Sequence, residues 1–549
     1  MTDDLWYRDA IFYEVYVRAF SDSNADGHGD LRGLMSRLDY LQELGVTCLW
    51  LQPVYPSPLK DDGYDIADHY GIHADYGTLE DFKALVAAAH ARGIRVITDL
   101  VLNHTSDEHP WFQAARKDAA SPFRDYYVWS DTDQKYKDAR IIFLDTQPSN
   151  WSLDERAGQY FWHRFYASQP DLNYDNPEVQ AEMLKVLSFW LDLGVDGFRA
   201  DAVPYLFERE GTNCENLPET HAFLRRIRRY IDQNYPGRIL LAEANQWPED
   251  VLPYFGTVQG PSTGAGEPEF HMGFHFPVMP RIFMALRRGE RGPLEWIMER
   301  TPAIPENCQW CTFLRNHDEL TLEMVTPEER EWMWQEYAPE PRMRLNLGIR
   351  RRLAPLLDND QRKIELANSL LFTLPGSPVL YYGDEIGMGD DIWLPDRNGV
   401  RTPMQWTGAQ DAGFSQAPSA RLYAPVIHGA EYGPARVSVE VQRGNPRSLF
   451  NATRRMISVR KRHRSLGWGD FEWVDAGDGA VASYLRRHGS ETMLVLNNLS
   501  GSVQQVRLPA NLNHNYEDAF TRRAVTLAEP LRLQPYQYLW LVSEDRDDR

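Results

Sequence analysis

Residues 179–201, VQAEMLKVLSFWLDLGVDGFRAD, contain one complete unit of a fold. Val179–Leu193 has the apolar spacing of an amphipathic helix, Gly194 ends it, and Val195–Ala200 is a short apolar run typical of a buried strand. Asp201 follows that strand directly. A helix leading into a buried strand, with a carboxylate where the strand ends, is the unit of a parallel α/β fold whose site lies at the strand ends.

The same unit recurs on both sides of this segment. Leu31–Leu44 and Phe82–Ala91 also have helical apolar spacing, and Gly45 and Gly93 follow them. Strands that alternate with helices predict parallel βαβ units, and eight such strands predict a closed (β/α)₈ TIM barrel. Besides Val195–Ala200, the strand-like runs are Ile11–Phe20, Val46–Leu51, Ile94–Leu100, Arg238–Ala242, Phe270–Phe276, Gln309–Leu314 and Ser377–Tyr382.

Three intervals are too long to be simple connections. Residues 105–170 follow the third strand, residues 321–360, with helical patterns, follow the seventh, and residues 385–446, rich in Gly and Pro, follow the eighth. Long insertions after barrel strands lie on the catalytic face and usually serve as lids. From about Leu466, alternating runs predict a terminal β-sandwich. The predicted domains are a catalytic barrel (1–104 and 171–465, with lid insertions at about 321–360 and 385–446), an inserted domain (105–170) and a C-terminal β-sandwich (466–549).

Composition restricts the partners and the location. The 549 residues carry a net charge of −21, which disfavours nucleic acid as a partner and suits a neutral substrate. The four cysteines are too few for a secreted disulfide framework, and Cys308 and Cys311 form a lone CxxC, so we expect reduced thiols and no zinc site. No apolar signal segment and no run of ~18 apolar residues occurs. We therefore expect a cytoplasmic protein without a membrane partner, and a homo-oligomer is compatible with the sequence.

Carboxylates end several of the predicted strands. They are Asp99 in DLVLNH, Asp201 in GFRAD, Glu243 in LLAEAN and Asp318 in LRNHD. Barrel chemistry takes place where the strands present their carboxyl ends, so four such carboxylates indicate an active site more strongly than isolated structural ion pairs. Cleavage of a glycosidic bond needs a carboxylate at the anomeric carbon and a protonated carboxyl at the leaving oxygen, ~5–5.5 Å apart in a retaining enzyme.

Asp201 and Glu243 come from neighbouring strands and fit these two roles. We predict that Asp201 is the nucleophile and Glu243 the general acid/base. Arg199 lies two residues before Asp201 and therefore points to the same side of the barrel, so its charge should keep Asp201 ionised. Glu243 must hold a proton near neutrality, so a less polar setting should raise its pKa.

The four strand-end segments, in this order, resemble the signature segments of the α-amylase superfamily of glycoside hydrolases. That family has a barrel with a domain inserted after strand three and a C-terminal β-domain, in agreement with the segmentation above. The resemblance implies that Asp201 is the nucleophile, that Glu243 is the acid/base and that Asp318 is a third carboxylate, which holds the ring hydroxyls. Tyr64 would stack on the sugar ring, and a surface ion pair is the alternative for Asp61 and Arg401. The implied glucose subsite consists of Asp61 and Tyr64 in DDGYD, His104, Gln169 in SQPDLN, Arg199, His317, and Arg401 in VRTPMQW.

Longer segments narrow the resemblance. GTNCENLPETHAF (residues 211–223) and LRNHDELTLEMVTPEER (residues 314–330) are similar to the branch of the superfamily that interconverts maltose and trehalose. This implies an intramolecular transglucosylase that retains configuration through a covalent glucosyl-enzyme and releases some glucose. Asn245 and Trp247 lie where the second glucose is expected, with packing as the alternative for Trp247. The main alternative function is a hydrolytic α-glucosidase with the same catalytic residues; a non-enzymatic binding module is disfavoured because the acids are present.

Two calcium sites and no organic cofactor are expected. Residues 22–30, DSNADGHGD, place oxygen ligands at alternate positions, as Ca²⁺ prefers, but Gly33 replaces the final Glu of an EF-hand loop. An ordinary Asp/Asn-rich turn is the alternative. The ligands of this first site would be Asp22, Asn24, Asp26, Asp30 and the carbonyl of His28. The superfamily resemblance alone implies a second site, made by Asn103, Asp171, Glu208 and the carbonyls of Tyr205 and Leu206.

Overall fold

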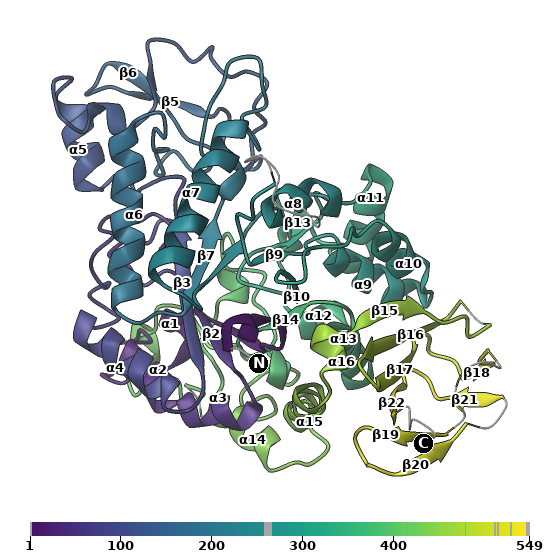
Figure 1. Ribbon diagram of the computed structural model, residues 1–549. Coiled ribbons are helices and arrows are strands. Elements are labelled where there is room, and N and C mark those ends of the chain that lie inside the picture. Colours follow the sequence, from purple (N-terminus) through teal and green to yellow (C-terminus); the bar gives the residue numbers. More distant parts are fainter. Residues whose placement is uncertain are drawn as a thin grey trace.

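The computed structural model describes residues 3–256, 266–409, 411–477, 479–509, 512, 515–527 and 530–544. Within these residues, eight parallel strands close into a barrel in chain order (Figure 1). The predicted (β/α)₈ barrel is confirmed. Its strands are β1 (Phe12–Val15), β2 (Cys48–Leu51), β3 (Arg95–Val101), β7 (Gly197–Asp201), β8 (Ile239–Ala242), β9 (Met272–Phe274), β10 (Gln309–Phe313) and β14 (Ser377–Tyr381).

Helices lie on the outer side of the strands (Figure 1), and the expected helix Leu31–Leu44 is divided at Arg37 into α2 (Leu31–Ser36) and α3 (Leu38–Leu44). Helix α6 (Pro177–Asp192) begins after Asn176, whose side chain accepts a hydrogen bond from the N–H of Glu178. Helix α4 (Leu79–His90) has a capping box between Thr78 and Asp81. The other main barrel helices are α7 (Pro218–Asn234), α8 (Pro248–Phe255), α9 (Val278–Arg288), α10 (Gly292–Glu299), α13 (Gln361–Thr373) and α15 (Leu449–Arg462).

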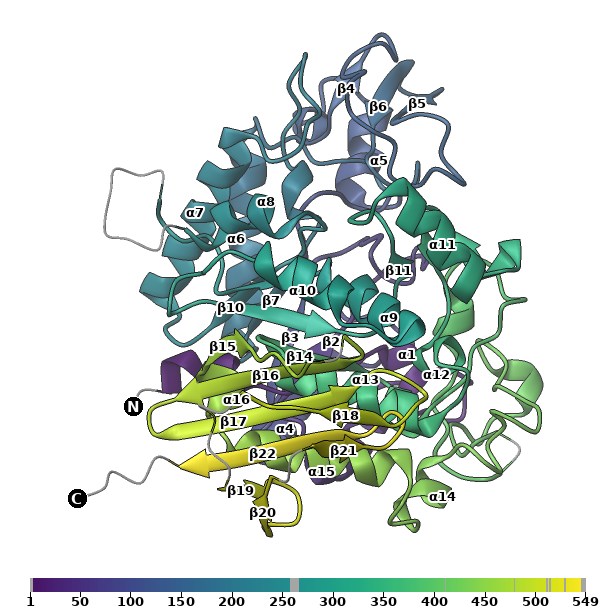
Figure 2. The ribbon, with the colours of Figure 1, turned by 90° about the vertical axis from the view of Figure 1, so that its right-hand side faces the viewer.

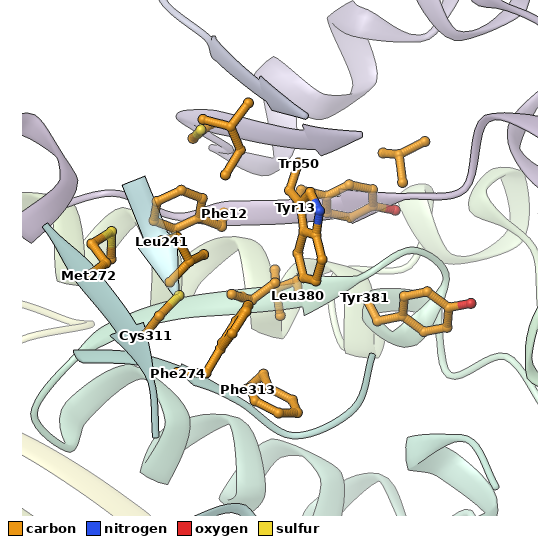
Figure 3. Close-up of a cluster of buried hydrophobic side chains, with 14 of the residues drawn as sticks. Phe12, Tyr13, Trp50, Leu241, Met272, Phe274, Cys311, Phe313, Leu380 and Tyr381 are labelled. Atoms are coloured by element: carbon orange, nitrogen blue, oxygen red, sulfur yellow. The ribbon is translucent and has the colours of Figure 1, made fainter. Parts of the chain in front are cut away.

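The interior of the barrel is packed with side chains. Figure 3 shows a cluster of aromatic, aliphatic and sulfur-containing residues from six of the strands, and none of those labelled is more than 4% exposed. A filled barrel leaves no channel, so a substrate site must lie at one end of it. The labelled residues are Phe12, Tyr13, Trp50, Leu241, Met272, Phe274, Cys311, Phe313, Leu380 and Tyr381.

A glycine lets β7 and β8 approach closely. Gly197 has φ of 152°, and a Cβ atom there would lie 2.3 Å from the carbonyl oxygen of Ile239, the first residue of β8. No larger residue fits this contact. The close pairing at the start of the strands sets the register in which Asp201 and Glu243 leave their carboxyl ends.

The insertions form their own small elements above the barrel. Residues 105–170 contain α5 (Pro110–Lys117) and a sheet of β4 (Trp129–Ser130), β6 (Gln159–Trp162) and β5 (Trp151–Asp154), at the top of Figure 1. A bridge between His104 and Asp171 joins the two ends of this segment. The interval after β10 was expected to look helical, but α11 (Pro327–Tyr337) is accompanied by a sheet of β11 (Leu320–Thr321), β13 (Gly348–Ile349) and β12 (Arg344–Leu345). After β14 the chain forms short 3₁₀ turns and α14 (Val439–Arg443).

Antiparallel strands follow the barrel, as predicted for the C-terminal part of the fold (Figure 2). Ser369 of α13 donates to Asn497 over 2.7 Å and accepts from the indole of Trp540 over 2.8 Å, which attaches this region to the barrel. We propose the predicted domain division, with borders at 104/105, 170/171 and 465/466. The larger sheet contains β15 (Asp470–Trp473), β16 (Val481–His488), β17 (Glu491–Asn498), β22 (Tyr538–Glu544), β19 (Asn515–Asp518) and β20 (Ala524–Thr526), and the smaller one β18 (Gln504–Val506) and β21 (Leu531–Leu533).

One predicted strand is wrong in its second half. Ile11–Phe20 is not continuous: β1 ends at Val15, and Val17–Phe20 forms the short helix α1. Almost every residue of the run is buried in both elements, so apolar content alone could not reveal the change. Among the described residues, no helix combines the length and apolar character needed to cross a membrane.

Candidate active site

The two carboxyl groups predicted to carry the chemistry lie at the carboxyl ends of neighbouring strands. Asp201 is the last residue of β7, and Glu243 follows directly after β8. Ala202 has φ of 52°, in the left-handed region that non-glycine residues rarely adopt, and its N–H donates to Oε2 of Glu243 over 3.0 Å. Strained backbone of this kind is common where a side chain must be held for function.

One guanidinium joins the two carboxyl groups. Arg199 donates through Nη1 to Asp201, and its Nη2 lies 2.6 Å from Oε1 of Glu243. Nη1 also donates to Asp99 over 2.7 Å. Asp201 and Glu243 thus contact the two terminal nitrogens of one guanidinium. Carboxyl groups held side by side in this way differ from those of inverting enzymes, which hold a water between carboxyl groups ~6.5–9.5 Å apart, so the pair suits a retaining reaction.

Burial gives the two carboxyl groups different protonation. It raises the pKa of Glu243 to about 8; Arg199 opposes this rise, and the charges of Asp201 and Asp318 add to it. Burial also raises the pKa of Asp201, but Arg199 and the hydrogen bond from Glu243 oppose the rise. Because the shared hydrogen bond favours an ionised Asp201, we assign the proton to Glu243. A protonated carboxyl beside an ionised one is what the first step of retaining hydrolysis requires.

Asp318 is surrounded by cationic side chains. Its Oδ1 accepts from Arg397 Nη1 over 2.6 Å and from Arg401 Nη2 over 3.3 Å, and its Oδ2 lies 3.2 Å from His317 Nε2. Burial works to raise the pKa of Asp318, but His317 and Arg397 hold it well below the usual range. The side chain remains 26% exposed. An ionised carboxylate is therefore open to the pocket and can accept hydrogen bonds from sugar hydroxyls.

These groups face a pocket at the carboxyl end of the barrel. Its empty volume is about 850 Å³ and it is open to solvent on one side. The wall mixes carboxylates with aromatic rings, as polar sugar edges and apolar sugar faces require. The predicted residues that line it are Asp61, Tyr64, His104, Asp201, Glu243, His317 and Asp318; further lining residues are Ile142, Phe143, Phe165, Ala202, Tyr205, Asn245, Phe276, Asn316, Glu319, Thr321, Glu323 and Arg397.

Three buried polar atoms in this wall have no hydrogen-bond partner among the described residues: the hydroxyl of Tyr64, Nε2 of His104 and Oδ1 of Asn245. Burial lowers the pKa of His104 to about 3, so its imidazole is neutral near pH 7. The ring of Tyr64 stacks on that of His317, with centroids 5.2 Å apart and an interplanar angle of 13°. Unpaired buried groups are costly, and the hydroxyls of a bound sugar would satisfy them.

Three predicted subsite residues lie behind the wall instead of in it. Arg199 lies beneath the carboxyl pair, and Gln169 donates to Asp61 over 2.9 Å. Arg401 donates to Asp62 and, over 2.9 Å, to the carbonyl of His317. Asp61 is 6% exposed and Arg401 1%, so neither belongs to a surface ion pair. These residues orient groups that face the pocket.

Sequence reasoning missed Arg397. It donates to Asp61 over 2.5 Å and to Asp318 over 2.6 Å, and so connects the two carboxylates on this side of the pocket. The segment DRNGVR contains arginines four residues apart, and only Arg401 was selected as the subsite residue. The 3₁₀ turn Asn398–Val400 between them turns both side chains toward the carboxylates. That turn could not be read from spacing.

The residues expected to face a second glucose behave differently from each other. Asn245 lines the pocket and donates to Thr321 over 3.1 Å, with its own side-chain oxygen left without a partner among the described residues. Trp247 is absent from the wall and packs edge-on against Trp296, with ring centroids 5.8 Å apart. The packing interpretation of Trp247 is therefore correct.

Side chains from the three insertions meet over the pocket. Arg140 of the first insertion donates to Glu323 over 2.6 Å, to Glu215 over 2.8 Å and to the hydroxyl of Tyr205 over 3.1 Å. The N–H of Asn346 donates to Asp145 over 2.7 Å. The inserted segment is thereby tied to the segments that follow β7 and β10.

Tyr166 extends these contacts to the third insertion. Its hydroxyl donates to Asp396 over 3.4 Å, next to the Arg397 that faces the pocket. The predicted lids therefore contact one another, and each contributes residues to the pocket wall.

The loop of the first predicted calcium site is internally satisfied. Asp22 accepts from the N–H groups of Asn24, Ala25 and Gly27, and Asp30 accepts from Ser23 and from the N–H of Gly33. The carboxylate oxygens of Asp26 accept from the N–H of His28 and the side chain of Asn24. Asx-type turns account for this geometry, so the loop gives no separate support for a cation.

At the second predicted calcium site, unlike the first, several ligand oxygens have no hydrogen-bond donor among the described residues. Asn103 Oδ1, Asp171 Oδ2 and Glu208 Oε1 are buried and have no hydrogen-bond partner among the described residues. Burial raises the pKa of Asp171 to about 8 and that of Glu208 well above its usual value, and the charge of Asp171 adds to the rise at Glu208. Hard oxygen atoms without donors fit a calcium ion. Across the described residues no cluster of three or more His, Cys, Asp or Glu suited to a metal occurs, and the four cysteines are free and buried.

Comparison with known proteins identifies the family of the chain. Residues 14–338 and 350–469 match the α-amylase catalytic domain, and residues 481–537 match the C-terminal domain of the α-amylase SusG. The chain belongs to the α-amylase family.

Within the α-amylase family, high identity extends over most of the chain. The trehalose synthase of Pimelobacter sp. is 61% identical over 92% of this chain and 88% of its own length. Trehalose synthase/amylase TreS of Mycobacterium tuberculosis is 60% identical over 94% of this chain and 85% of its own. A solved structure of an inactive MutB double mutant with isomaltulose has a TM-score of 0.78 at 28% identity, covering 98% of this chain and 99% of that one.

Proposed function

We propose that the chain is a trehalose synthase, an intramolecular transglucosylase that interconverts maltose and trehalose with retention and releases some glucose. The observation that carries this function is the 60–61% identity to trehalose synthases over nine-tenths of the chain, together with two carboxyl groups that share one guanidinium and line a pocket. The substrate is a neutral disaccharide.

The geometry supports a double displacement. Asp201 attacks the anomeric carbon of the non-reducing glucose, forming a C–O bond to the enzyme as the glycosidic C–O bond breaks. Glu243 gives its proton to the departing 4-oxygen, so glucose leaves neutral and Glu243 becomes a carboxylate. Glu243 then takes the proton from the anomeric hydroxyl of that glucose, which attacks the glucosyl-enzyme and frees Asp201. Two inversions leave the α configuration at the donor carbon.

Asp318 and the residues around it would hold the transferred glucose. Its carboxylate, kept ionised by Arg397 and His317, accepts hydrogen bonds from ring hydroxyls, while Tyr64 provides an aromatic surface beside them. Interactions that strengthen as the ring distorts favour the transition state over the ground state. Asp61, His104, Gln169, Arg199 and Arg401 complete this subsite as direct or supporting residues.

The second glucose must turn before it attacks, and it must reach the glucosyl-enzyme before water does. Water at about 55 M would intercept the glucosyl-enzyme in an open site. We assign the acceptor space to the side of the pocket lined by Tyr205, Asn245, Glu319 and Glu323. The contacts between Arg140 and Glu323 and between Asn346 and Asp145 would keep the insertions closed over it.

Calcium is proposed as a structural ion. Asn103, Asp171 and Glu208, with the carbonyls of Tyr205 and Leu206, would hold it between the barrel and the inserted segment. A bound cation there would neutralise two buried carboxylates and fix the start of the inserted segment, with no part in proton transfer. The ligand set at Asp22, Asn24, Asp26, His28 and Asp30 stays a prediction, as do the cytoplasmic location and a homo-oligomeric state.

A product assay tests the function. The purified chain is incubated with maltose, and separately with trehalose, and the disaccharides and glucose are separated by anion-exchange chromatography. Each substrate should yield the other disaccharide with a smaller amount of glucose. An Asp201→Asn variant serves as the control for contaminating activity. Glucose from maltose without any trehalose would instead establish the hydrolytic α-glucosidase.

A further inference from the structure

A buried carboxylate on the first barrel strand lies directly behind the donor subsite. Glu14 of β1 is 0% exposed and has no role in the steps described above. Its Oε1 faces three donors: Nδ1 of His317, the N–H of His317 at 3.4 Å and the side-chain amide of Gln52 at 3.0 Å. Since every donor points at Oε1, that oxygen acts as an acceptor. Glu14 therefore presents a carboxylate oxygen to the back of His317.

His317 lies between two carboxylates. Nδ1 contacts Glu14, and Nε2 lies 3.2 Å from Oδ2 of Asp318. Asp318 is ionised, because Arg397 and Arg401 both donate to it. An ionised carboxylate only accepts hydrogen bonds, and neutral imidazole can donate from one nitrogen only. Both contacts are satisfied together only when His317 carries a proton on each nitrogen.

We propose that Glu14 is a positioning residue that holds His317 as an imidazolium, so that Nε2–H anchors Asp318 and the charged ring forms a fixed support for Tyr64. Only the effect of Glu14 on turnover rests on the proposed function. The protonation of His317 can be measured without substrate. Glu14 acts through His317 and does not itself face the pocket.

The surroundings of His317 agree with a charged ring. Burial works to lower its pKa, but the charges of Asp318 and Glu14 raise the pKa to about 9. The ring of Tyr64 lies parallel to it, as a cation–π contact requires. The titratable and charged groups that face His317 are Glu14 on β1, Asp99 on β3, Tyr64 in the loop after β2, the neighbouring Asp318, and Arg401 after β14.

Replacing Glu14 with glutamine separates charge from hydrogen bonding. The amide oxygen of Gln can still accept from Nδ1, so the ring keeps its orientation. Without the negative charge, however, His317 loses its second proton at lower pH, and Nε2 then presents a lone pair to Asp318. Two acceptors 3.2 Å apart repel each other, so Asp318 should move out of its position beside the sugar.

The first experiment observes His317 directly. ¹⁵N-histidine labelling and NMR titration of the substrate-free protein follow the protonation of both ring nitrogens, and a His317→Gln sample assigns the resonance. In the wild type His317 should stay doubly protonated at pH 8, and in Glu14→Gln it should become neutral at least about one pH unit lower. A ring that remains doubly protonated to the same pH in Glu14→Gln overturns the proposal, whatever the activity.

The second experiment measures turnover against pH. Glu14→Gln should retain near wild-type kcat at pH 6. Relative to the wild type it should lose about a further twofold at pH 8 and about fivefold at pH 9, because the pKa of His317 moves from about 9 to about 8 and its deprotonation adds to the loss that Glu243 causes. Glu385→Gln is the matched control: Glu385 is also buried in the barrel, but it accepts from Tyr13 and Tyr40 and does not contact His317. A shift of equal size in both variants would indicate general destabilisation and refute the specific role of Glu14.

Discussion

Arg140→Ala should convert part of the isomerase into a hydrolase. Arg140 connects the inserted segment to Glu323, Glu215 and the hydroxyl of Tyr205, through contacts of 2.6, 2.8 and 3.1 Å. Its side chain is 38% exposed, so each ion pair must be discounted for solvent screening. As a network the contacts favour the closed pocket by about 1–2 kcal/mol, a factor of roughly 5–30 in the closed population. The catalytic carboxyl groups are untouched by the substitution.

The assay is the ratio of glucose to trehalose formed from maltose at low conversion. We expect this ratio to rise about fivefold or more in Arg140→Ala while total maltose consumption falls less, because water reaches the glucosyl-enzyme before the second glucose has turned. Arg116→Ala is the control: Arg116 belongs to the same inserted segment and lies 2.7 Å from Asp154, away from the other insertions. If Arg140→Ala and Arg116→Ala give the same ratio as the wild type, contact between the insertions does not exclude water.

Three further predictions concern the catalytic groups and the metal. The pKa of Glu243 is raised to about 8, so its acid form is lost above that pH and kcat on maltose should fall as pH rises through about 8. Glu243→Gln should lower kcat at least about a hundredfold and abolish this fall. If the fall remained in the variant, Glu243 would not be the acid. Arg397→Ala leaves two buried carboxylates without their shared cation and should lower kcat/KM by about a hundredfold or more. The control is Arg342→Ala, which removes a guanidinium stacked on the exposed Trp393 and should change kcat/KM less than about twofold. Equal effects of the two substitutions would contradict the assigned subsite. Chelation should lower the melting temperature of the wild type and leave that of Asp171→Asn nearly unchanged, and an equal decrease in both would exclude the proposed calcium site.

The barrel could be predicted because each strand carries local signals. Gly194 ends a helix, an apolar run follows it, and Asp201 comes at the end of the run, so the unit is visible within 23 residues. Ile11–Phe20 lacked such a signal. Its residues are buried both as a strand and as a helix, and the change from β1 to α1 depends on tertiary packing.

The position of the proposed catalytic pair could also be predicted, because Asp201 is the last residue of its strand and Glu243 directly follows its own. Residues on insertions could not be placed in this way. Arg397 reaches Asp61 across 336 positions of sequence, and Arg140 reaches Glu323 across 183. Contacts over such distances depend on how three separate insertions pack against one another. The spacing of residues along the chain does not predict that packing.

The catalytic groups lie on the barrel strands and the residues that close the pocket lie on the insertions, and this difference affects the reaction. The barrel strands fix Arg199, Asp201 and Glu243 through backbone register, so the groups that form the glucosyl-enzyme do not depend on the contacts between the insertions. The fate of that intermediate depends on whether glucose or water reaches the anomeric carbon first, and the side chains that decide this come from the insertions. Substitutions of residues that join the insertions to one another, such as Arg140, should therefore change the product ratio more than the rate of maltose cleavage. Substitutions at the strand ends, and of Arg397, which holds Asp318, should lower both products together.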